Sequence, residues 1–101
     1  MAAWVIAYWL ISAIIAGMNG RHRKTLEIIF YDPINGSLPW DRIEALMVSI
    51  GSKVLEGSGS SVTFERNGRR AYFHRPHPQR DALIYRVRAV REFLIKLEIT
   101  P

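Results

Sequence analysis

The 101-residue chain predicts one small α+β domain, in which helices pack on one face of an antiparallel sheet. Two observations predict this class. Asn67-Gly68 joins two segments in which apolar and polar residues alternate, which is typical of a β-hairpin. In the sequence before and after the predicted strands, apolar residues recur every three or four positions, as they do in amphipathic helices. The length allows a single domain with a small core.

The charge is concentrated in one part of the chain. The first twenty residues contain no charged side chain, so the net charge of +5 belongs entirely to residues 21–101. A basic domain of this size indicates a polyanionic partner, which could be nucleic acid, an acidic protein or an anionic membrane. Because the chain has no cysteine, disulfides and thiolate metal sites are excluded, and a cytoplasmic protein is expected. We expect no metal and no cofactor.

Residues 1–17 form an apolar extension ahead of the basic domain, residues 18–101. Two interpretations of this extension remain open. It is short for a membrane-spanning helix, but Arg21, Arg23 and Lys24 follow it directly, as they would behind an inner-membrane anchor with a cytoplasmic domain. Alternatively, translation begins at Met18 and residues 1–17 are an upstream extension, in which case no membrane is involved.

Two helices are expected before the sheet. Residues 24–31 place Leu26, Ile29 and Phe30 on one face, and Asp32-Pro33 ends this helix. The second helix has Ser37 as its predicted N-cap and Gly51 as its C-terminal stop. Its buried stripe consists of Trp40, Ile43, Leu46, Met47 and Ile50.

Three strands are expected, over residues 53–55, 61–66 and 69–75. The two-residue turn at Asn67-Gly68 sets the hairpin register, which places Ser61 opposite His74. One face of the hairpin then gathers the apolar side chains of Val62, Phe64, Ala71 and Phe73. The other face carries Ser61, Thr63, Glu65, Arg70, Tyr72 and His74, and it is a candidate working surface.

The last helix follows Pro76 and Pro78, which end the third strand, and Asp81 is its predicted N-cap. Its buried stripe consists of Val87, Val90, Phe93, Leu94 and Leu97. The element order is therefore a leading helix followed by α-β-β-β-α. Two helices on one face of a three-stranded antiparallel sheet is the layout of a double-stranded-RNA-binding domain, here with an extra N-terminal helix.

Four segments, in this order and spacing, resemble the HicA-type toxins of bacterial toxin–antitoxin systems. They are "MNGRHRKTLEIIF", "LPWDRIEALMVSIG", "RAYFHRPHP" and "VRAVREFLIKLEI", and the resemblance covers residues 18–99. It implies the same α-β-β-β-α fold and ribosome-independent cleavage of mRNA, an endoribonuclease activity that arrests growth. It also implies a HicB-type antitoxin as partner, in a hetero-oligomer that covers the active surface.

One position departs from the family pattern. The usual Gly-Ser-His signature here reads Gly59-Ser60-Ser61, and serine cannot act as a general base near neutral pH. Because His74 faces Ser61 in the predicted register, we expect His74 to supply the imidazole. The predicted catalytic residues are His74, His77 and Ser61. The predicted RNA-binding residues are Lys53, Arg66, Arg69, Arg70, Tyr72, Arg75, Arg86 and Arg88. The alternative is a catalytically impaired module that still binds RNA or the antitoxin.

Overall fold

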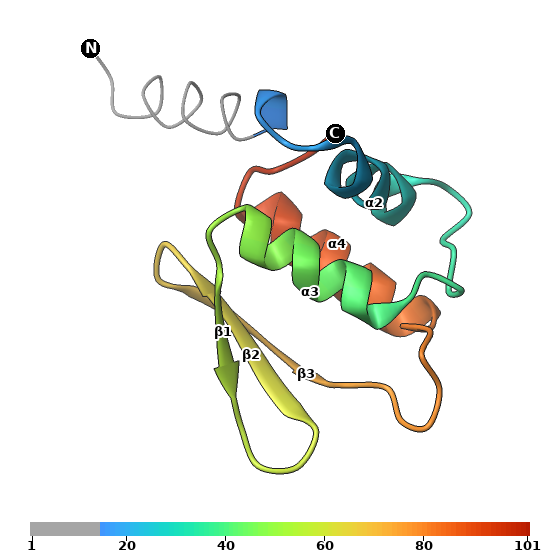
Figure 1. Cartoon of the computed structure of the whole chain (residues 1–101), viewed down its shortest axis with the longest axis vertical. Coiled ribbons are helices and arrows are strands. Elements are labelled where there is room, and N and C mark those ends of the chain that lie inside the picture. Colours follow the sequence, from blue (N-terminus) through green and yellow to red (C-terminus); the bar gives the residue numbers. More distant parts are fainter. Residues whose placement is uncertain (1–14) are drawn as a thin grey trace.

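Three helices and a three-stranded antiparallel sheet form the part of the chain that the computed structural model describes, residues 15–101. The elements are α2 (Gly20–Phe30), α3 (Trp40–Ser49), β1 (Lys53–Glu56), β2 (Ser61–Arg66), β3 (Arg69–His74) and α4 (Ile84–Lys96). In Figure 1, α3 and α4 lie on one side of the sheet, and α2 packs on these two helices. The predicted α+β fold with an extra N-terminal helix is therefore confirmed. The predictions for residues 1–17 fall almost entirely outside the described residues.

The first helix begins earlier than predicted. The Asn19 side chain accepts a hydrogen bond from the His22 backbone N–H (3.0 Å), so α2 starts at Gly20 instead of residue 24. The helix ends at Phe30, just before Asp32-Pro33, as expected. Its first turn is basic and has no apolar periodicity, which is why the pattern of buried residues did not reveal it.

Both side-chain caps predicted for the later helices, Ser37 and Asp81, are wrong. Pro39 and Leu83 occupy the N-cap positions of α3 and α4, and neither forms a side-chain cap. The reason is a non-local pairing of two connecting segments. Trp40 donates its backbone N–H to the Arg80 carbonyl, and the Ala82 N–H donates to the Leu38 carbonyl (both 2.8 Å). Backbone N–H groups near the start of each helix therefore find their acceptors in the segment that leads into the other helix.

The C-terminal stop of α3 is confirmed at Gly51, whose φ is +88°. Its N–H donates to the Val48 carbonyl, and the Ser52 N–H donates to the Met47 carbonyl, both at 3.0 Å. This is a Schellman motif, which needs a left-handed residue after the helix and therefore favours glycine. The chain then turns directly into β1.

The hairpin register is confirmed at every pair from Ser61–His74 to Arg66–Arg69. Asn67 and Gly68 both have positive φ, as a type I′ turn requires. The sheet order is β1-β2-β3, so β1 and β3 are its edges. Two boundaries differ by one residue. β1 extends to Glu56, and β3 ends at His74 instead of Arg75.

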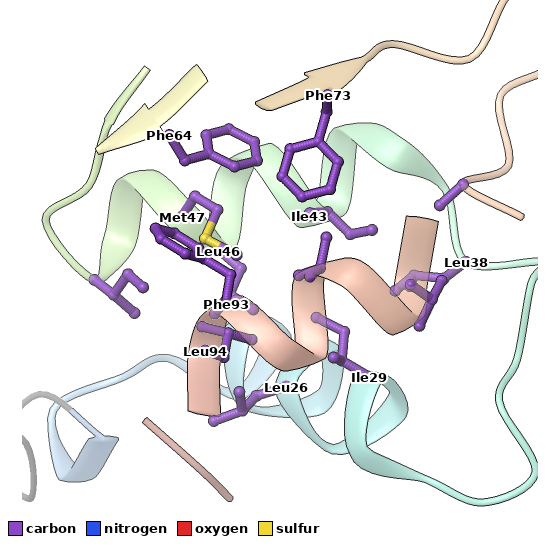
Figure 2. Close-up of a cluster of buried hydrophobic side chains, with 14 of the residues drawn as sticks. Leu26, Ile29, Leu38, Ile43, Leu46, Met47, Phe64, Phe73, Phe93 and Leu94 are labelled. Atoms are coloured by element: carbon purple, nitrogen blue, oxygen red, sulfur yellow. The ribbon is translucent and has the colours of Figure 1, made fainter. Parts of the chain in front are cut away.

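The core spans all three layers of the domain. Phe64 and Phe73 point from the sheet toward α3, while Leu26 and Ile29 of α2 lie on the far side of the cluster (Figure 2). Trp40 at the start of α3 packs on both phenylalanines, with ring centroids 6.0 Å from Phe64 and 5.3 Å from Phe73. This aromatic group holds the hairpin against α3 and leaves its opposite face to solvent.

Candidate active site

The outer face of the hairpin presents the predicted pair of Ser61 and His74. The two residues are direct partners in the β2–β3 ladder, at the end of the hairpin away from the turn. Directly opposite side chains on one face of a sheet have Cβ atoms about 4.5–5.5 Å apart. His74 is exposed, and Tyr72 on the same face is 74 % exposed. The structure therefore places an exposed histidine directly across the hairpin from Ser61, as the predicted register requires.

A hollow of about 210 Å³ lies between β3 and α4, and His74 forms part of its wall. Arg86 ties the two elements together at this point. Its Nε donates to the His74 carbonyl (2.8 Å), and its guanidinium lies 4.7 Å from the centre of the Tyr85 ring. The lining residues are Tyr72, Phe73, His74, Tyr85, Arg86 and Ala89. An imidazole, exposed aromatic rings and a cation around one hollow suit a nucleobase and its phosphate.

Tyr85 is the residue of this hollow that sequence reasoning missed. It is 59 % exposed and follows Ile84, which is also exposed at the start of α4. Both residues lie off the buried stripe of the helix. This pattern of apolar residues outside the stripe was the signal in the sequence that could have pointed to Tyr85. What could not be read from the sequence is that the start of α4 docks beside the end of β3.

Arg75, predicted to contact RNA, is bound to two carboxylates. Its guanidinium makes four hydrogen bonds of 2.7–3.0 Å, two to Glu44 of α3 and two to Glu56 of β1. Glu44 also accepts a hydrogen bond from the Trp40 indole N–H. These bonds lower the pKa of Glu56 and raise that of Arg75, whose hydrogen bond to Glu56 is the largest cause. We call Arg75, Glu44 and Glu56 the Arg75 clamp, and it anchors the chain immediately after His74.

The other predicted RNA-binding cations fall into two groups. Arg66 donates to the Ile50 carbonyl at the end of α3 (2.8 Å), and Arg70 pairs with Glu65 (2.6 Å). An RNA contact by Arg66, Arg70 or Arg75 would have to compete with these bonds. The side chains of Lys53, Arg69 and Arg88 are exposed and make no hydrogen bond or ion pair within residues 15–101.

A family model matches residues 40–98, from the first residue of α3 to just past the end of α4. It describes the HicA toxin of bacterial toxin–antitoxin systems. The chain belongs to the HicA toxin family. The match covers the whole α-β-β-β-α unit, including the hairpin with Ser61 and His74. No curated protein and no solved structure matches the chain.

Three further findings concern the described residues of this HicA-family chain. His77 lies in the connection between β3 and α4, where it is exposed and does not line the hollow beside His74. Within residues 15–101, no three side chains of His, Cys, Asp or Glu gather as a metal site would require, and no helix is long and apolar enough to cross a membrane.

We expect Arg75→Gln to lower the free energy of unfolding of this toxin by roughly 1–3 kcal/mol, the cost of losing hydrogen bonds to charged groups. Because the folded-state pKa of Glu56 is lowered, its contribution is fully present above the ordinary carboxyl pKa of 4.5 and is lost as the pH falls through the lowered value. Urea unfolding of the wild type and the variant at pH 7 and pH 3 measures both effects. Arg69→Gln, at the exposed hairpin turn, is the control. A variant as stable as this control at pH 7 would show that the clamp contributes nothing.

Proposed function

We propose that this HicA-family toxin binds and cleaves mRNA in the cytoplasm and is neutralised by a HicB-type antitoxin. The observation that carries the proposal is the position of His74. It is exposed, it faces Ser61 across the hairpin, and it stands in the wall of a hollow that also offers Tyr72, Tyr85 and Arg86. This arrangement supports an imidazole acting on RNA even though Ser61 replaces the family histidine.

The proposed reaction is attack of the ribose 2′-oxygen on the neighbouring phosphorus. His74 accepts the 2′-hydroxyl proton, the bond from phosphorus to the 5′-oxygen breaks, and His77 donates a proton to that oxygen. The products are a 2′,3′-cyclic phosphate and a 5′-hydroxyl. Arg86 is the cation that we assign to the charge that develops on the phosphate, because its Nε holds the His74 carbonyl while its Nη2 makes no hydrogen bond within the described residues.

The surface around the hollow supports a protein partner as well. Leu83, Ile84, Tyr85 and Tyr72 form an exposed apolar rim beside Arg86 and Arg88. Exposed apolar side chains gathered in this way are typical of interaction sites. We propose that the antitoxin covers this rim with apolar and acidic side chains, and thereby closes access to His74.

Ser61 favours a second candidate function. If His74 does not replace the family histidine, the domain binds RNA or the antitoxin without cleaving RNA. Only the first candidate predicts toxicity, whereas a complex with the antitoxin is compatible with both.

Induced expression of the full chain in bacteria, with and without the gene encoded next to its own, tests the proposal. We expect growth arrest from the chain alone and normal growth when the neighbouring gene is co-expressed, because the antitoxin covers the hollow. Normal growth in both strains, together with a stable complex between the two proteins, would contradict cleavage and support the binding module.

A further inference from the structure

A second and larger hollow lies next to the end of β3, where the chain continues from His74 to Arg75 and Pro76. Its volume is about 570 Å³, and its walls come from the start of α3, the connection after β3, and Arg21 of α2. Four arginines and only two acidic residues line this hollow. The charged lining residues are Arg21, Arg42, Arg75, Arg80, Asp41 and Glu44.

The charges that remain in this hollow after internal pairing are mainly positive. Within the clamp, Arg75 pairs with two carboxylates, Glu44 and Glu56, so the clamp leaves no unpaired positive charge. The other charged groups that line the hollow are three guanidinium groups, those of Arg21, Arg42 and Arg80, and one carboxylate, that of Asp41. Arg21 and Arg80 are exposed, and Arg42 is half-buried. The Nε of Arg42 is buried, and no residue within 15–101 accepts a hydrogen bond from it. Planar guanidinium groups that lack an acceptor favour a phosphate ligand, which they can bind in bidentate fashion.

The two hollows are neighbours along the chain. His74 lines the first, and the next two residues, Arg75 and Pro76, line the second. Successive residues are only about 3.8 Å apart between Cα atoms, so the Cα atoms of His74 and Pro76, one in each wall, are less than about 8 Å apart. The Arg75 clamp holds the wall between the two hollows in place.

We propose that this second hollow is a subsite for the RNA phosphodiester backbone, next to the nucleotide held at His74, and that Arg21, Arg42 and Arg80 bind it. The inference rests on the proposed RNA-binding function. The subsite positions the strand and has no part in bond cleavage. Phosphate contacts of this kind set the register of a nucleic acid without reading its sequence.

The test measures binding of a single-stranded 2′-O-methyl RNA, which cannot undergo 2′-oxygen attack, to the full chain at several salt concentrations. The probe has a 5′-hydroxyl end, so that it contains only internal phosphodiesters. We expect Arg42→Gln/Arg80→Gln to weaken binding roughly tenfold at low salt and to reduce the salt slope by about 1.4, at about 0.7 per lost contact. The matched control is Lys24→Gln/Lys96→Gln, which removes the same charge from exposed positions outside the hollow.

If the arginine variant binds like the control while the wild type binds RNA, the subsite is wrong and the proposed function stands. If the wild type binds no RNA, the proposed function itself fails. Binding that requires an added 5′-phosphate would show a site for phosphate monoesters and overturn the backbone subsite. Because Arg42 is half-buried, thermal melting checks folding. Arg21→Gln/Arg80→Gln, with both changes at exposed positions, repeats the test if the first variant does not fold.

Discussion

His74→Ala is expected to slow RNA cleavage at least about 100-fold, because a positioned general acid or base typically contributes 10²–10⁴-fold to a rate. His74 has the accessible imidazole nearest to Ser61, and nothing else in the hollow can take its role near neutral pH. The measurement is the rate at which the purified full chain cuts a labelled RNA. Binding of the 2′-O-methyl RNA should change much less than the rate.

Two further variants make this prediction specific. His22→Gln, in the first turn of α2, removes another histidine outside the hollow and should leave the rate unchanged. Ser61→His restores the family residue opposite His74, and this variant should cleave RNA faster than the wild type. Full cleavage by His74→Ala would exclude His74 from catalysis, whatever the effect of the other two changes.

Phe64→Ala should have the largest effect on stability, about 3–5 kcal/mol, which is typical of removing a fully buried phenylalanine. The side chain is completely buried on the inner face of β2, and its ring packs on Trp40 and Phe73. For a domain of this size such a loss lowers the melting temperature by more than about 10 °C. Thermal unfolding followed by circular dichroism measures the shift.

Tyr72→Ala is the matched control for that experiment, since it removes an aromatic ring from the opposite face of the same hairpin. Tyr72 is largely exposed, so stability should change by no more than about 0.5 kcal/mol. Equal losses from Phe64→Ala and Tyr72→Ala would mean that the hairpin does not pack against α3 through the face assigned here.

Local signals in the sequence were sufficient for most of the fold. Asn67-Gly68 and the alternation around it predicted the whole hairpin register, because the turn geometry and the buried face depend only on neighbouring residues. The predictions of the helix N-caps were wrong because the hydrogen-bond partners that determine the helix starts are distant in the sequence. Ser37 and Asp81 have the chemistry of N-caps, but the segments that contain them pair with each other across the domain.

In the candidate site, too, the features that depend on neighbouring residues could be predicted, and those that depend on distant residues could not. Ser61 and His74 were placed opposite each other correctly, since the hairpin alone determines that pairing. The partners of Arg75 lie 31 and 19 residues away, in α3 and β1, so no local pattern could show that its charge is already paired. The hollow lined by Tyr85 forms only when α4 docks beside β3.

The most direct test of RNA cleavage by this HicA-family toxin is to incubate the purified full chain with an RNA and with its fully 2′-O-methylated counterpart. Attack by the 2′-oxygen predicts that the RNA is cut, leaving 2′,3′-cyclic phosphate ends, while the methylated strand is bound but stays intact. Cleavage of both strands would contradict the proposed chemistry. If both strands are bound and neither is cut, the domain is a binding module in which His74 does not replace the missing histidine.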